Sequence, residues 1–160
     1  MDVTIIGTGN MGRGIATRLL AGGHQVTLLD REVGKSEALA RELGDSVDAG
    51  TVGDPIAGDV VVLAVPYEAA APLVGQYGEA LSGKVVVDIT NPVNWETFDG
   101  LVTPPDSSAA EEIKREAPEG ARVVKAFNTT FAGTLVEGDV GDQPLDVYVA
   151  GDDAETKEMV

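Results

Sequence analysis

The chain has 160 residues, of which 43% are hydrophobic, a size and composition typical of one globular domain with a substantial core. Its 27 acidic and 11 basic residues give a net charge of −16, which disfavours binding to nucleic acid or to an anionic membrane. The absence of cysteine excludes disulfides, thiolate metal ligands and a cysteine nucleophile. With neither a long apolar run nor a leader segment, we expect a cytoplasmic protein that does not associate with membranes.

Strand-like and helix-like segments alternate along the chain. The predicted strands are 2–6, 25–29, 59–65, 84–89, 122–126 and 145–150, and the predicted helices are 10–21, 34–43, 67–81, 107–117 and 153–160. A further short strand near Val47 is weakly indicated. Several strands are unbroken runs of Val, Ile and Leu, which is typical of parallel sheets buried on both faces. The alternation predicts right-handed βαβ crossovers and hence an α/β fold with a doubly wound parallel sheet.

The first strand-to-helix connection is rich in glycine, with the sequence GTGNMGRG at residues 7–14. Gly7, Gly9 and Gly12 form the pattern G-x-G-x-x-G of Rossmann-type dinucleotide-binding domains. Gly7 would permit a tight turn, Gly9 would let a pyrophosphate approach the backbone, and Gly12 would let the helix pack closely on the strand. The pyrophosphate would lie on the free N–H groups of the helix, so an acidic protein needs no lysine there.

An acidic residue, Asp30, ends the second predicted strand. At this position of the pattern a carboxylate accepts hydrogen bonds from the 2′-hydroxyl of the adenosine ribose, which favours NAD. Arg31 and Lys35 follow and are candidates to bind the 2′-phosphate of NADP instead. For Lys35 we favour an exposed position in a loop of mixed charge. Asp30 and Arg31 therefore favour different nucleotides.

The other strand ends supply neutral and amide-rich segments. Pro66 and Tyr67 follow the third main strand, residues 90–95 follow the fourth, and residues 127–130 follow the fifth. Such groups orient a planar ring and leave the chemistry to cofactors, so we assign no catalytic side chain and no metal ligand. The single histidine, His24, precedes the second strand and is predicted at the opposite edge of the sheet, as a structural turn residue.

Four segments carry a resemblance to a known family. TIIGTGNMGRGIATRLLAGGHQVTL, VVLAVPYEAA, VVVDITNPVNW and VVKAFNTTFAGTL, in this order, resemble the NADP oxidoreductases that depend on the deazaflavin coenzyme F420. The broader group includes the related reductase domains of membrane ferric reductases. The resemblance covers nearly the whole chain and implies a Rossmann fold that passes a hydride between NADP and a deazaflavin bound against the nicotinamide.

The resemblance also implies where the two cofactors bind. Thr8, Gly9, Asn10 and Met11 would contact the pyrophosphate, Ala64, Val65, Pro66, Asn91 and Pro92 the nicotinamide side, and Ala126, Phe127 and Asn128 the second cofactor.

Two features depart from the family pattern. Family members often carry a small residue followed by arginines where this chain has Asp30 and Arg31, so we expect only a modest preference for NADP, with NAD as the alternative. Family members also continue beyond the position of residue 160 with a portion that helps to form the deazaflavin site and a homodimer. We therefore expect residues 1–160 to be a Rossmann domain lacking a further C-terminal strand–helix portion.

These observations lead to one functional interpretation and two alternatives. We expect an oxidoreductase that transfers a hydride between NADP(H) and coenzyme F420 or a flavin-like acceptor. One alternative is a reductase with another acceptor, such as ferric iron through a flavin or a small imine. The other is a non-catalytic NAD(P)-binding module or redox sensor.

Overall fold

The computed structural model describes all residues from Met1 to Val160 and contains one seven-stranded sheet and a separate two-stranded hairpin. The strands are β1 (Asp2–Ile6), β2 (Gln25–Asp30), β3 (Val47–Thr51), β4 (Val60–Leu63), β5 (Val85–Asp88), β6 (Arg122–Ala126), β7 (Asp139–Val140), β8 (Gln143–Pro144) and β9 (Val149–Ala150). The helices are α1 (Asn10–Ala21), α2 (Val33–Leu43), α3 (Tyr67–Tyr77), the 3-10 helix η1 (Gly78–Leu81), α4 (Ala109–Glu116), α5 (Ala132–Glu137) and α6 (Ala154–Met159).

The strand order of the large sheet is β3-β2-β1-β4-β5-β6-β9. All pairs from β3 to β6 are parallel, which confirms the predicted doubly wound α/β fold, and the short strand near Val47 is present as β3. This is the strand order of dinucleotide-binding Rossmann domains. Strands β2 and β3 are added on one side of β1 and strands β4 to β6 on the other, so the order of the strands reverses between β1 and β4. Ligands of such sheets bind outside the carboxyl ends of the strands at that point.

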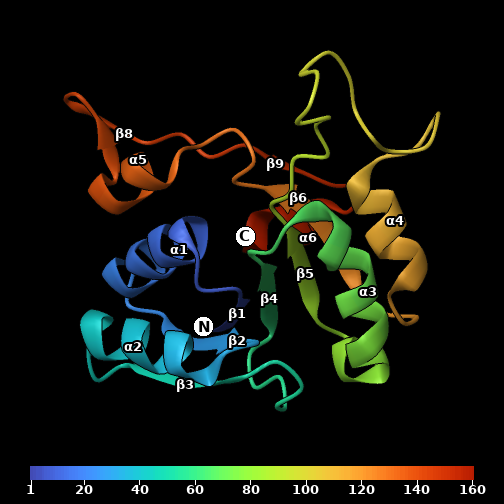
Figure 1. The fold of residues 1–160 in the computed structure, drawn as a ribbon. Coiled ribbons are helices and arrows are strands. Elements are labelled where there is room, and N and C mark those ends of the chain that lie inside the picture. Colours follow the sequence, from blue (N-terminus) through green and yellow to red (C-terminus); the bar gives the residue numbers. More distant parts are fainter.

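Helices cover both faces of the sheet, α1 and α2 on one and α3 and α4 on the other (Figure 1). Helices α1 and α2 bury Ile15 and Leu39 against one face, together with alternate residues of the central strands. Helices α3 and α4 bury Val74 and Ile113 against the other face. The four residues of β4 and of β5 are all buried, as expected for strands covered on both sides. None of the helices has the length and apolar character needed to cross a membrane.

The last strand differs from the prediction. Only Val149 and Ala150 of the predicted strand 145–150 pair with the sheet, and they run antiparallel to β6. A parallel strand would require the chain to cross back to the amino edge of the sheet. Here the chain instead forms α5 and the β7–β8 hairpin, and then returns along β6 from its carboxyl end (Figure 1).

Three helical segments also differ from the predicted ranges. The predicted helix 67–81 divides into α3 and η1 at Gly78, whose φ of 49° lies in the left-handed region. Helix α4 begins at Ala109 because the Ser108 side chain accepts a hydrogen bond from the Glu111 N–H, and the Glu111 side chain accepts one from the Ser108 N–H. Helix α5 was not predicted, because its six residues form no long apolar pattern.

The packing of α5 explains the fourth glycine of the glycine-rich segment. Helix α5 lies against α1 and buries Leu135 completely. A Cβ atom at Gly14 would lie 2.9 Å from the Leu135 Cβ and 3.0 Å from the Ala132 carbonyl oxygen, which is closer than side chains tolerate. Gly14 is thus required for contact between two helices and not for the turn.

We predict opposite effects on stability from two glycine-to-alanine substitutions in helices. Gly14→Ala should lower the free energy of unfolding by about 1–3 kcal/mol, because the added methyl group overpacks the contact with α5. Gly34→Ala, in the first turn of α2, meets no atom within 4 Å and should raise it by about 0.4–1 kcal/mol. Urea denaturation measures both values, and an equal gain in both variants would contradict the packing assigned to Gly14.

Candidate dinucleotide-binding site

The turn between β1 and α1 leaves no room for side chains at two of its glycines. Gly7 has a φ of 105°, and a Cβ there would lie 2.8 Å from the Ala64 carbonyl carbon and closer still to its oxygen. A Cβ at Gly12 would lie 3.1 Å from the Gly7 carbonyl carbon, again with the oxygen closer. The turn thus packs tightly against the chain beyond β4, and α1 packs tightly against the Gly7 carbonyl of the turn.

Gly9 has a different environment. No atom lies within 4 Å of the position that a Cβ would occupy there, so the backbone faces open space. Gly9 is the N-cap of α1 with extended backbone angles, and neither a side-chain cap nor an acidic residue occupies the first turn. By contrast, Ser108 and Glu111 cap α4. The amino end of α1 therefore presents unpaired N–H groups and the positive end of its dipole at the predicted pyrophosphate position.

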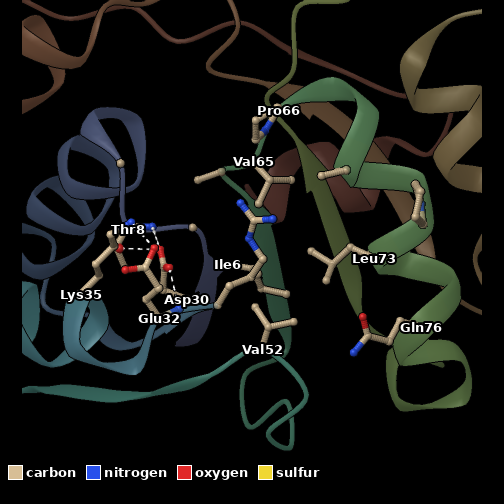
Figure 2. Close-up of a pocket in the computed structure, with 16 residues that line it drawn as sticks. Ile6, Thr8, Asp30, Glu32, Lys35, Val52, Val65, Pro66, Leu73 and Gln76 are labelled. Carbon is tan, nitrogen blue, oxygen red and sulfur yellow. Dashed lines mark hydrogen bonds and ion pairs between the residues drawn. The ribbon is translucent and has the colours of Figure 1, made fainter.

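A cavity of about 420 Å³ opens beside this turn, where β1 and β4 end. Figure 2 shows Thr8, Asp30, Glu32 and Lys35 gathered in one part of it, with Val65 and Pro66 in another. Its full lining is Ile6, Gly7, Thr8, Gly9, Asp30, Arg31, Glu32, Lys35, Val52, Ala64, Val65, Pro66, Ala69, Pro72, Leu73 and Gln76. The structure thus brings together the glycine turn, the end of β2 and the residues after β4.

Asp30 is held against the glycine turn. Its Oδ2 accepts hydrogen bonds from the Thr8 N–H at 3.1 Å and the Thr8 hydroxyl at 2.6 Å, and its Oδ1 accepts one from the Glu32 N–H at 3.1 Å. Partial burial raises the pKa of the Asp30 carboxyl, but these hydrogen bonds and the nearby Lys35 outweigh it and hold that pKa below its usual value. The carboxylate is therefore charged and turned toward Thr8.

The two predicted phosphate-binding cations differ in their contacts. Lys35 lies in the first turn of α2 and forms an ion pair with Glu32 at 2.6 Å, and this exposed contact raises the pKa of Lys35 through the Glu32 hydrogen bond. Arg31 is exposed, lines the cavity and forms no ion pair. Arg31 is therefore the cation that is available to an anionic ligand.

Two residues predicted on the nicotinamide side line a second cavity instead. Asn91 and Pro92 border a space of about 820 Å³ between the β5 and β6 loops, α4 and α6, together with Asn128. The Asn91 side-chain amide donates a hydrogen bond to the Asn128 carbonyl oxygen at 2.9 Å. This contact joins the two loops that the resemblance assigns to the nicotinamide and to the second cofactor.

The remaining predicted residues, Asn10, Met11, Ala126 and Phe127, line neither of these two cavities. Asn10 is exposed at the start of α1, whereas Met11 packs against the apolar core. Ala126 is fully buried, so its side chain reaches neither cavity. Phe127 packs on the same core and has a left-handed φ of 62°, which is uncommon for a bulky residue. Its carbonyl oxygen accepts hydrogen bonds from both the N–H and the hydroxyl of Thr130.

Helix α3 supplies lining residues that the sequence reasoning missed. Ala69, Pro72, Leu73 and Gln76 face the 420 Å³ cavity from the side opposite the glycine turn. Their spacing of three, four and seven residues is that of one helical face, and this pattern after the third main strand was the available signal. Val52, just after β3, was also missed.

Two side-chain contacts join neighbouring elements, one between β5 and β6 and one between α3 and α4. Asp88 is fully buried at the end of β5, where it accepts hydrogen bonds from Lys125 Nζ at 2.7 Å and the Thr90 N–H at 2.8 Å. The Tyr67 hydroxyl donates to Glu112 at 2.5 Å, which raises the pKa of Tyr67 to about 12 and joins α3 to α4. His24 contacts the Met1 amino group at the amino edge of the sheet, away from both cavities, as predicted.

The fold and this site define a Rossmann-type dinucleotide-binding domain of an oxidoreductase. The chain belongs to the family of coenzyme F420-dependent NADP oxidoreductases, whose family model matches residues 2–92. It is 32% identical to an F420-dependent NADP reductase from Methanocaldococcus jannaschii, over 100% of this chain and 77% of that protein.

Solved structures agree with this assignment. A hypothetical protein from Sinorhizobium meliloti superimposes with a TM-score of 0.86 and 28% identity, over 99% of this chain and 77% of the other. A putative F420-dependent NADP reductase from Arthrobacter superimposes with a TM-score of 0.81 and 28% identity, over 98% and 76% of the two chains.

We predict that Gly9→Val abolishes nucleotide binding and preserves the fold. The valine side chain would fill the open space beside the turn, and its extended backbone angles suit any residue. The dissociation constant for NADPH should rise at least ~100-fold, which is about 2.7 kcal/mol. Titration with NADPH measures this, and circular dichroism checks the fold. Gly100→Val, exposed and outside the cavity, should bind as wild type, and unchanged affinity in Gly9→Val would refute the assigned position of the pyrophosphate.

Proposed function

We propose that this protein transfers a hydride between NADP(H) and the deazaflavin coenzyme F420. The observation that supports it best is the 420 Å³ cavity at the β1–β4 switch point, which joins an uncapped helix amino end to Asp30 and Arg31. A dinucleotide extends from such a turn, with its adenosine toward β2 and its nicotinamide toward the carboxyl ends of β4 and β5. The family membership and the relatives named as F420-dependent NADP reductases support the choice of substrates.

The pyrophosphate would be bound by backbone groups alone. The N–H groups at the start of α1 and the open approach at Gly9 supply hydrogen-bond donors and a positive dipole end. This arrangement suits a chain of net charge −16, because no cluster of lysines is required to hold the phosphates. Thr8 would position the ribose end through its contact with Asp30.

The nicotinamide end would be oriented by the segments after β4 and β5. Val65 and Pro66 line the 420 Å³ cavity, and Asn91, which follows β5, lines the second cavity. The hydrogen bond from Asn91 to the Asn128 carbonyl oxygen fixes the two loops relative to each other. The 820 Å³ cavity beyond them is the space in which we place the deazaflavin.

Catalysis in this proposal is by positioning. NADPH gives a hydride to the deazaflavin and becomes NADP⁺. The reduced deazaflavin takes up one further proton from solvent. Holding two planar rings in a near-attack geometry accounts for a large share of the acceleration of such a transfer. No side chain is required to remove a proton from carbon, and His24 lies at the opposite edge of the sheet.

We include a cytoplasmic homodimer in the same proposal. Large apolar side chains are exposed on the β5–α4 loop and around α5, among them Trp95, Phe98 and Phe131. Trp95 and Phe98 pack edge to face on each other, with 5.5 Å between their ring centroids. Exposed aromatic clusters of this kind are typical of protein interfaces. Light scattering that gives the mass of a single chain would exclude the dimer.

Absorbance of oxidised F420 in the presence of NADPH tests the proposed reaction. We expect turnover that requires both substrates. His24→Ala should retain kcat within about twofold, whereas Asn91→Ala should lower kcat about tenfold or more, because misplacing reactants by about 1 Å can cost 100-fold. Nucleotide binding without F420 reduction would favour a binding module. A 100-fold loss of kcat in His24→Ala, about 2.7 kcal/mol, would contradict the mechanism.

A further inference from the structure

The ribose end of the cavity carries a carboxylate that cannot turn away freely. Asp30 accepts three hydrogen bonds, two from Thr8 and one from the Glu32 N–H, and these donors reach it from two different segments (Figure 2). Rotating the carboxylate outward would break the 2.6 Å bond from the Thr8 hydroxyl and leave partly buried donors unpaired. The lowered pKa of Asp30 keeps the group charged at neutral pH.

This fixed carboxylate still has capacity for a ligand. An ionised carboxylate offers about four lone-pair positions, of which three are in use at Asp30. A ribose 2′-hydroxyl is a hydrogen-bond donor and suits the remaining position. A 2′-phosphate is almost entirely an acceptor at neutral pH, so at the same place it gains no hydrogen bond and meets charge repulsion.

The cations of the site only partly compensate this repulsion. Lys35 is already paired with Glu32, which leaves Arg31 as the unpaired cation in the lining. Arg31 suits both nucleotides, because a guanidinium can bind a phosphate in bidentate fashion or stack on an adenine ring. With Asp30 and Glu32 beside it, the ribose end has two acidic and two basic side chains and no net positive charge.

We infer that the site accepts NAD(H) as well as NADP(H), and that Asp30 is the residue that determines this dual specificity. Asp30 binds the 2′-hydroxyl of NAD(H), and Arg31 binds the 2′-phosphate of NADP(H). The inference rests on the proposed function in one respect, that a nicotinamide nucleotide occupies the 420 Å³ cavity.

Dissociation constants of NAD⁺ and NADP⁺ for the full chain, measured by calorimetry at physiological ionic strength, test this inference. We expect the two wild-type values to agree within about tenfold. Asp30→Asn keeps the shape of the side chain and removes its charge. It should tighten NADP⁺ and weaken NAD⁺, shifting their ratio by about 10–100-fold, the range of a charged hydrogen bond.

Two further variants make the result specific to Asp30. Asp48→Asn removes one negative charge from an exposed position of β3 outside the cavity, and should leave the ratio unchanged. Thr8→Val removes the hydroxyl that holds Asp30, and should weaken NAD⁺ more than NADP⁺. The wild-type ratio of the NAD⁺ and NADP⁺ dissociation constants tests dual specificity even if a variant fails to fold.

The outcomes that overturn the inference are distinct from failure of the proposed function. A wild-type preference for either nucleotide above about tenfold overturns dual specificity, as does a ratio in Asp30→Asn equal to that in Asp48→Asn. If NADPH then still reduces F420, the proposed function stands without this inference. If neither nucleotide binds, both are wrong.

Discussion

The backbone of Gly7 lies against the carbonyl of Ala64, and the rest of the site depends on this contact between the ends of β1 and β4. Any side chain at Gly7 or Gly12 would collide with backbone atoms, which cannot move aside as a flexible side chain can. The Gly7 N–H also donates to Leu29 O, and the Ala64 N–H donates to Ile6 O, so three strand ends are joined at this point. The same contact aims the amino end of α1 into the cavity.

At the ribose end of the cavity, charged groups and their hydrogen bonds determine the properties of the site. Thr8 belongs to the glycine turn, and its two hydrogen bonds to Asp30 connect that turn to the end of β2. One residue thus links the place where we put the pyrophosphate to the place where we put the ribose. In the proposed function, an acidic chain would bind an anionic ligand here through backbone dipoles and Arg31, which forms no ion pair.

The parts predictable from the sequence were those set by local patterns. Unbroken apolar runs identified the central strands, and the glycine spacing identified the turn, because only glycine fits its close contacts. Helix α5 could not be predicted, since its six residues are held by burial of Leu135 against Gly14, two positions far apart in sequence. For the same reason the pairing of Asp88 with Lys125, which depends on the β5–β6 register, was not foreseen.

Amide hydrogen exchange of the full chain, with and without NADPH, tests most directly whether the first βα turn holds the nucleotide. We predict slower exchange at residues 8–12 and 30–32, because the ligand would pair the free N–H groups of the turn and cover the ribose end. Little change is expected at His24, on the opposite edge of the sheet. Protection confined to the cavity between α4 and β6, with exchange at residues 8–12 unaltered, would contradict this site.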